Sequence, residues 1–468
     1  MAASAATPAP PSRRLPAIDL WWPAALGLCV ITGYLTLHSL HLTAAVVTSV
    51  IVLGLYVRSR RAGVMALWVA WLVLPAVRRM FDLAEPFSNA DPLSAVPFVL
   101  TAVIAVAELA RADLSRRAKL IVSLAVAGFA FGFPAGVLAS PKAAVFGLLA
   151  YVSGALAFGI GYREARDRTL TLPLVLTLAA VPISVYGILQ SLAPLTRWDA
   201  VWLNTVGPNF NSIGSKGGGD LRIFSVLNSP GTLAVVLALT VVSLLTARRF
   251  GPARAVALMV TLAALALTLV RGSWAALGVA LVVVWIIAPA RIGRRILLVG
   301  VLGVIAFPLF IAGNPNAHRV TKRATTFSNL GTDTSAQARI NTPKQLVPVL
   351  VHNPLGQGLG TAGEASRVGT KSQLRNTDNA LLSLLYQSGP VGFAMVMAAY
   401  VLGLISVARN LRRRRSLSDV LVLGCMGVLT VQLVTADVFY GVTGPIIWYL
   451  LGFAVRCDES LDRRPLAA

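Results

Sequence analysis

The sequence predicts an all-α protein: a polytopic membrane helix bundle with about 14 transmembrane helices (12–14) and a large extracytoplasmic loop. Of its 468 residues, 56% are hydrophobic and only 13% are charged, and the mean hydropathy is +0.75. An ordinary soluble protein carries roughly 25% charged residues. Apolar runs long enough to cross a hydrocarbon core of about 30 Å recur along nearly the whole chain.

The helices are expected where these apolar runs lie, and the polar stretches between the runs set their ends. The expected ranges are 16–36, 42–57, 63–77, 92–110, 118–138, 143–162, 170–191, 231–247, 255–270, 273–290, 296–313, 378–407, 417–436 and 440–455.

The net charge of +23 is gathered in short basic clusters between the apolar runs, so it indicates membrane topology and no nucleic-acid partner. An even number of helices puts all of these clusters on one side, which the positive-inside rule makes cytoplasmic. Both termini are then cytoplasmic, and the long polar segments 192–230 and 314–377 lie outside. The clusters are 58–61, 111–119, 163–168, 248–254, 291–295 and 409–415.

The chain is expected to divide into four parts. Residues 1–15 are rich in Ala and Pro, which predicts a disordered cytoplasmic N-terminus followed by a retained first helix. Residues 16–191 form an N-terminal transmembrane bundle, 192–456 a transmembrane core that includes both external loops, and 457–468 a cytoplasmic tail.

The sequence offers little support for a metal or cofactor site. Cys29, Cys425 and Cys457 are scattered, and neither a phosphate-binding nor a dinucleotide-binding glycine pattern is present. Charge is nearly absent from the expected helix interiors, where a proton-coupled or ion-coupled transporter would need it. We therefore expect no metal and no cofactor, and look for function at the outer face.

Arg271 stands in "TLALTLVRGSWAALGVALVVVWIIA", between two apolar runs that leave almost no loop. An arginine at this position either extends to the outer interface or binds an anion. The pattern alone leaves both possibilities open.

Three other outer stretches carry polar residues that each have an ordinary structural explanation. Arg222, in "GGGDLRIFSVLNSPGTLA", could be a solvated residue of a flexible loop. The segment 335–351 is amphipathic at helical spacing and could lie on the outer leaflet. Asp378, in "NTDNALLSLLYQSGPVGFAMVM", could simply cap a helix. His318 and His352 have no partner at metal-ligand spacing, which favours satisfied or solvated side chains.

Together, these stretches resemble the O-antigen ligase and polymerase family of bacterial polysaccharide assembly. The order matches over about 217–400. An arginine precedes one helix, "R-G-x-W" opens another, and a large external loop contains Ser335, Arg339 and "N-P-L-G-x-G-L-G". The series ends in "D-N-x-L-L-x-L-L-x-x-x-G-x-x-G", which begins at Asp378.

The resemblance implies transfer of a glycan from a polyprenyl-pyrophosphate-linked oligosaccharide to a glycan or lipid acceptor. The reaction would take place at the outer face of the cytoplasmic (inner) membrane, without metal. Arginines suit a departing diphosphate, and the acceptor hydroxyl needs a general base. The expected catalytic residues are Arg222, Arg271, Arg339 and Asp378, and the expected substrate-binding residues are Lys216, Lys344, His352 and Asn379.

One departure from the family pattern bears on the activity. Ligases of the family typically carry His before the Asn of "H-N-x-x-L", and Asp378 takes that place here. The difference tilts the prediction slightly toward polymerase. A transporter or flippase for lipid-linked glycans is the alternative, and a scaffold in cell-envelope assembly is a third class. Other polysaccharide-assembly proteins are possible partners.

Overall fold

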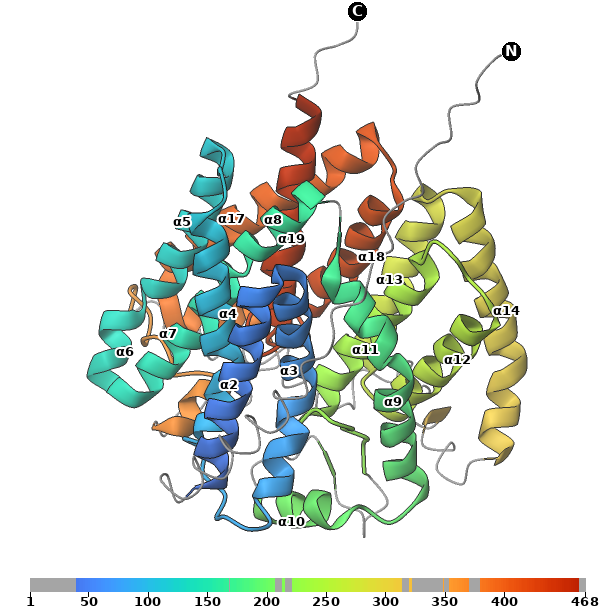
Figure 1. The fold of residues 1–468 in the computed structure, drawn as a ribbon, viewed down its shortest axis with the longest axis horizontal. Coiled ribbons are helices and arrows are strands. Elements are labelled where there is room, and N and C mark those ends of the chain that lie inside the picture. Colours follow the sequence, from blue (N-terminus) through green and yellow to red (C-terminus); the bar gives the residue numbers. More distant parts are fainter. Residues whose placement is uncertain are drawn as a thin grey trace, which may run out of the picture.

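The structure is a computed structural model that describes residues 39–167, 169–206, 213–214, 221–313, 320–321, 348, 353–369 and 379–462. Regular structure in this part of the chain is helical throughout (Figure 1). In chain order the helices are α2 (Leu40–Arg58), α3 (Arg60–Phe81), α4 (Pro92–Ala110), α5 (Arg116–Ala130), α6 (Phe133–Ala139), α7 (Pro141–Leu156), α8 (Phe158–Asp167), α9 (Thr171–Leu192), α10 (Arg197–Val206), α11 (Pro230–Thr246), α12 (Pro252–Leu267), α13 (Arg271–Ile287), α14 (Ala290–Gly313), the 3-10 helix η3 (Glu364–Val368), α17 (Ala380–Arg413), α18 (Leu417–Gln432) and α19 (Thr443–Asp462).

The described helices confirm an all-α bundle of membrane-spanning character. Seven stretches are long and apolar enough to cross a membrane: α2, α3, α4, α5 with α6, α7 with α8, α9 and α17. Four shorter apolar helices, α11, α12, α13 and α18, accompany them. The first expected helix, 16–36, lies outside the described residues, so the expected total of about fourteen stays a prediction.

Polar caps ahead of the apolar runs set many of the helix starts. The side chains of Ser115 and Ser140 accept hydrogen bonds from the backbone N–H three residues on, and the Asp91 side chain accepts one from Leu93 N. At α18, Ser416 and Asp419 form a reciprocal capping box. Each such cap stabilises its helix by about 1 kcal/mol.

The structure corrects two details of the expected helices. The ranges 118–138 and 143–162 are each broken, the first where Pro134 opens α6 because proline cannot donate inside a helix, and the second at Ala157. The expected external loop 192–230 also contains an unpredicted helix, α10.

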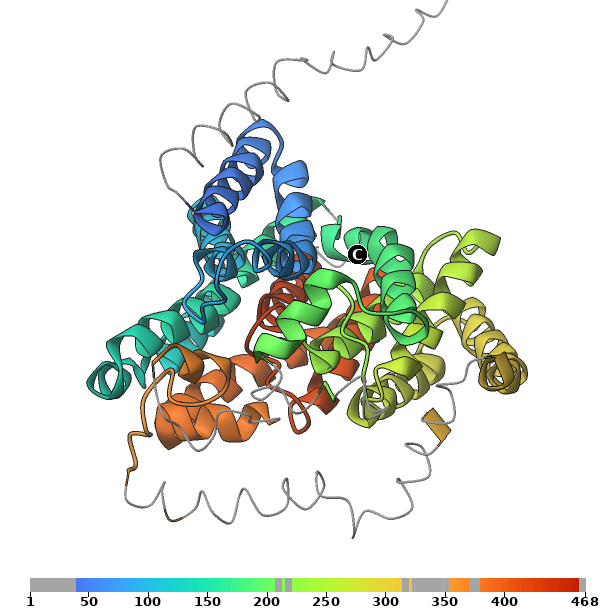
Figure 2. The ribbon, with the colours of Figure 1, turned by 90° about the horizontal axis from the view of Figure 1, so that it is seen from below.

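The helices α11 and α19 form the centre of the bundle. From Leu233 to Thr246 every residue of α11 is buried, and so is every residue of α19 from Thr443 to Val455. A helix that is apolar all round belongs in the interior, surrounded by other helices. Seen from below, the other helices surround these two, with α2 at one side and α14 at another (Figure 2).

Basic residues from distant parts of the chain meet at one end of the bundle, here called the basic end. Arg60 pairs with Glu108 and Asp167, with nitrogen–oxygen distances of 2.7 Å, and Arg117 pairs with Asp458 at 2.8 Å. These contacts join the clusters near residues 60, 111 and 163 to the end of α19. In Figure 1 the end of α19 is at the top, and α10 lies at the opposite end.

Candidate functional site

The turn between α18 and α19, residues 433–442, joins the starts of two helices at the end opposite the basic end. Ala380 N, in the first turn of α17, donates to Leu433 O at 2.9 Å and to Ala436 O at 3.1 Å. In the first turn of α13, Ser273 Oγ accepts a 2.5 Å hydrogen bond from Gln432 Nε2, at the end of α18. A Cβ added at Gly272 would lie 3.0 Å from Thr435 Oγ1. Residues near 272, 380 and 435 are therefore neighbours.

Arg271 opens α13 at this meeting point and is half-buried. Only residues 268–270 separate it from α12, and Leu269 takes the unusual φ of +55° that so short a connection demands. At the other end of α13, Arg295 donates to Leu245 O and Ala247 O in the 245–250 region. The absence of a loop thus fixes Arg271 at the opposite end from Arg295, as the sequence predicts.

Arg222 lies beside a segment that is firmly held. Its backbone N–H donates to Ile213 O at 2.8 Å. Three residues on, Ser225 adopts φ of +48°, and its N–H donates to Gln190 Oε1 at 2.7 Å, while its hydroxyl donates to Ile183 O at 2.6 Å. Arg222 itself is half-buried. These contacts favour an ordered segment over a flexible loop as the setting of Arg222.

A buried ion pair supports the same segment and could not be read from the sequence. Arg79 Nη1 lies 2.8 Å from Asp199 Oδ1, and both side chains are 0% exposed. Arg79 Nη2 also donates to Ser225 O at 2.5 Å, and the guanidinium lies over the rings of Trp202 and Phe224. This pair joins α3 to α10 and to the segment that carries Arg222.

Asp437, in the α18–α19 turn, is a carboxylate that sequence reasoning missed. Its Oδ2 accepts hydrogen bonds from Tyr151 Oη at 3.1 Å and from Ser383 Oγ at 3.2 Å. Gln387 Nε2 donates to both of these hydroxyls at 3.0 Å. The other oxygen, Oδ1, is buried without a hydrogen-bond partner in the described part of the chain.

The surroundings of Asp437 favour its protonated form. Burial, the largest cause, and the nearby negative charge of Glu364 together raise the pKa of the carboxyl to about 7, against the hydrogen bonds from Tyr151, Ser383 and the Phe439 backbone. A carboxyl with this pKa exchanges a proton near neutral pH. Its only signal in the sequence is a single acidic residue between two apolar runs.

The glycine-rich stretch 353–360 completes a break in α17. Gly389 has φ of +64° and Pro390 has no N–H, so the carbonyls of Tyr386 and Gln387 lose their helical donors. Gln357 N and Gly358 N supply them, at 2.8 and 3.1 Å. Gly356 has φ of +83°, and a Cβ there would lie 2.5 Å from Gly389 N, so both the fold and the space require glycine.

A cavity of about 190 Å³ opens beside these elements. Its walls come from α3, α4, α7, α10, the segment 227–232, η3 and the end of the α18–α19 turn. Aromatic rings line much of it, and polar and charged side chains line the rest. The lining residues on which the argument below depends are Trp71, Arg78, Phe98, Asn228, Glu364 and Tyr440.

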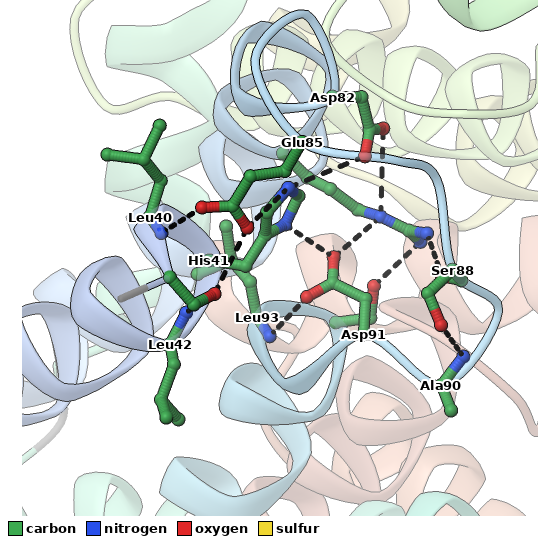
Figure 3. A network of polar contacts seen from close by, with 12 residues as sticks. Leu40, His41, Leu42, Asp82, Glu85, Ser88, Ala90, Asp91 and Leu93 are labelled. Carbon is green, nitrogen blue, oxygen red and sulfur yellow. Dashed lines mark hydrogen bonds and ion pairs between the residues drawn. The ribbon is translucent and has the colours of Figure 1, made fainter. Parts of the chain in front are cut away.

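Arg78, which lines this cavity, belongs to a polar network in which His41, Asp82 and Asp91 lie together (Figure 3). Arg78 Nε lies 2.7 Å from Asp91 Oδ2, its Nη1 donates to Ser94 Oγ at 2.8 Å, and its Nη2 donates to Ser88 O at 2.6 Å. His41 Nδ1 contacts the same oxygen of Asp91 at 3.1 Å. The network fixes the connection between α3 and α4.

Several of the predicted site residues cannot be placed. Lys216, Arg339, Lys344, His352 and Asp378 lie outside the described residues, as does the expected amphipathic segment 335–351 apart from residue 348.

Asn379 is described, and it caps α17: its Oδ1 accepts a 3.0 Å hydrogen bond from Leu382 N. The N-cap of this helix is therefore Asn379 and not Asp378. The contacts place Arg271 at the α18–α19 turn and Arg222 near α9, and their convergence on one anion stays a prediction.

The fold is that of a polytopic membrane protein. At the end opposite the basic end, where the α18–α19 turn lies, it places Arg271, Arg222 and the Asp437 carboxyl. Residues 255–397 match the O-antigen ligase family, so the chain carries a domain of that family, as the resemblance predicts. This domain indicates a membrane glycan transferase of the ligase or polymerase type. The match includes Arg271 and the glycine-rich stretch, whereas Arg222 and Asp437 lie outside it. A search of curated proteins gives no match.

Proposed function

We propose that this protein polymerises or ligates polyprenyl-pyrophosphate-linked oligosaccharide at the outer face of the cytoplasmic membrane, with polymerase slightly favoured. The proposal rests on the match to the O-antigen ligase family. Within the matched domain, the helices that start near Arg271 and Asn379 both contact the α18–α19 turn, which carries Asp437. The basic end would face the cytoplasm together with both termini.

The proposed reaction forms one glycosidic bond and breaks one sugar–phosphate bond. The acceptor hydroxyl attacks the anomeric carbon of the donor glycan, its proton passes to a base, and the lipid-borne diphosphate departs with the bonding electrons. Arginine suits the departing group because its planar fork pairs with two phosphate oxygens at once. We assign this role to Arg271 and Arg222, together with Arg339.

Two carboxylates can serve as the base. Asp378 occupies the place where ligases of the family carry His. Asp437 has a pKa of about 7, close to the value at which a general base is both deprotonated and basic enough to act. Tyr151 and Ser383 hold one oxygen of Asp437 and leave the other without a partner among the described residues.

The test is a transfer assay with purified protein in lipid nanodiscs and a polyprenyl-pyrophosphate-linked oligosaccharide. Polymerase activity lengthens the lipid-linked glycan and releases carrier diphosphate. Ligase activity releases the diphosphate only when a separate lipid acceptor is added. A protein that moves the labelled donor across a vesicle membrane without releasing diphosphate would be a transporter, and the proposal would be wrong.

A further inference from the structure

The cavity beside the α18–α19 turn connects the N-terminal helices to the family domain. Trp71 and Phe98 reach it from α3 and α4, Glu364 from η3, and Tyr440 from the turn. At about 190 Å³ it is smaller than the roughly 300–1,000 Å³ pockets that hold drug-sized ligands. It therefore has room for a group the size of one sugar ring, and because the cavity is partly open, a longer glycan can continue outside it.

The polar groups of the cavity call for a ligand that donates hydrogen bonds. Asn228 Oδ1 is buried and has no hydrogen-bond partner in the described part of the chain. An acceptor buried in this way destabilises the protein unless a donor reaches it. The carboxylate of Glu364 is a second acceptor on the wall. A diphosphate has only acceptor oxygens and satisfies neither group, whereas each sugar hydroxyl donates.

The charges of the cavity do not favour an anion. Arg78 faces it, but Asp91, Ser94 and Ser88 take up its donors. Arg367 brings another cation, and it stands in the same short helix as the anionic Glu364.

The aromatic walls suit the remaining surface of a sugar. The rings of Phe98 and Trp71 meet edge to face with centroids 4.8 Å apart, and Tyr440 lies 5.8 Å from Phe98. A pyranose has apolar C–H faces and a rim of hydroxyl groups, so it packs on such rings while its rim meets the acceptors.

We infer that this cavity is a subsite for one sugar ring of the substrate glycan, held by hydroxyl donation to Asn228 Oδ1 and to the Glu364 carboxylate. The inference rests on the proposed function and adds to it: the glycan is held by Asn228, by η3 and by the aromatic rings of α3 and α4, apart from the arginines assigned to the diphosphate. The N-terminal bundle thereby takes part in substrate choice, although it lies outside the matched domain.

The test measures binding of free methyl glycosides of glucose, galactose and N-acetylglucosamine to the full-length protein in nanodiscs, by saturation-transfer difference NMR. We expect at least one of them to bind. Asn228→Leu should lower its affinity at least fivefold, and Asn228→Asp, which keeps an acceptor oxygen, should retain it. Asn204→Leu, on the exposed face of α10, is the matched control.

Glu364 provides an independent pair of variants if Asn228→Leu does not fold. Glu364→Leu should weaken sugar binding, and Glu364→Gln, which keeps a carbonyl acceptor, should weaken it less. Displacement of the glycoside by inorganic pyrophosphate, binding of no glycoside, or equal binding by Asn228→Leu and the wild type would each overturn the inference.

The two proposals fail separately. If the transfer assay succeeds and no glycoside binds in the cavity, the sugar subsite is wrong and the glycan transferase stands. If glycosides bind in the predicted manner and no diphosphate is ever released, the transferase is wrong and the sugar site stands.

Discussion

Aspartates at the two ends of the bundle have different partners. At the basic end, Asp458 lies 2.8 Å from Arg117 and 3.8 Å from both Arg409 and Arg413. At the opposite end, Asp437 receives neutral donors, the hydroxyls of Tyr151 and Ser383 and the backbone of Phe439. Asp458 thus lies among cations, whereas burial among neutral groups raises the pKa of Asp437 to about 7. One end anchors charge, and the other can exchange a proton.

The arginines of the two ends differ in the same way. Arg60 and Arg117 at the basic end are about a quarter exposed, and their buried partners Glu108 and Asp458 each have another arginine within 4 Å. At the opposite end, Arg79 is fully buried, and Arg271 and Arg222 are half-buried in tightly held backbone. Removing a cation should therefore have small effects at the basic end and large effects at the other.

The largest effect on stability is expected for Arg79→Leu. It leaves Asp199 as an uncompensated buried charge and should lower the free energy of unfolding by about 3–5 kcal/mol. Arg117→Ala leaves Asp458 with Arg409 and Arg413 within 4 Å, so it should cost clearly less than Arg79→Leu. Thermal unfolding in nanodiscs measures both, and equal losses would remove the contrast between the ends.

The largest effect on activity is expected for Arg271→Ala. Loss of one cation that stabilises the departing diphosphate should reduce turnover by about 10²–10³-fold, the range found when one preorganised donor is removed from an active site. Arg291→Ala, an exposed arginine at the basic end, is the control and should keep normal turnover. Undiminished transfer by Arg271→Ala would leave that arginine with an interfacial role only.

The pH dependence of transfer distinguishes the two aspartates. Since the pKa of Asp437 is about 7, its basic form accumulates as the pH rises through that value, and the wild-type rate should rise with it. Asp437→Asn keeps an acceptor for Tyr151 and Ser383 but cannot take up a proton. Its transfer rate should therefore fall about 10²-fold or more, and the rise of the rate with pH near 7 should disappear. Asp458→Asn should keep this rise. If Asp437→Asn keeps it and Asp378→Asn loses it, Asp378 is the base.

The smallest effect concerns the glycine-rich stretch. Gly356→Ala forces a Cβ within 2.5 Å of Gly389 N at a positive φ, and should destabilise the protein by about 1–3 kcal/mol. Gly54→Ala in α2, where a Cβ meets nothing within 4 Å, should be neutral or slightly stabilising. Melting temperatures of the two variants test whether the pairing of this stretch with α17 is required.

The sequence predicts those features that depend on local pattern. Apolar runs locate α4 and α9 almost to the residue, and the lack of a loop before Arg271 places it opposite the basic end. The pairing of Arg79 with Ser225, 146 positions away, and of Tyr151 with Asp437, 286 positions away, depends on tertiary packing that no local pattern records. For this reason the helices were predictable, whereas Asp437 and the cavity were not.

The break in α17 has a consequence for biogenesis. An unpaired carbonyl is costly in hydrocarbon, and those of Tyr386 and Gln387 find their donors in a stretch synthesised about thirty residues earlier. That stretch therefore leaves the ribosome before α17 does. The order of synthesis supplies the donors before the carbonyls that need them.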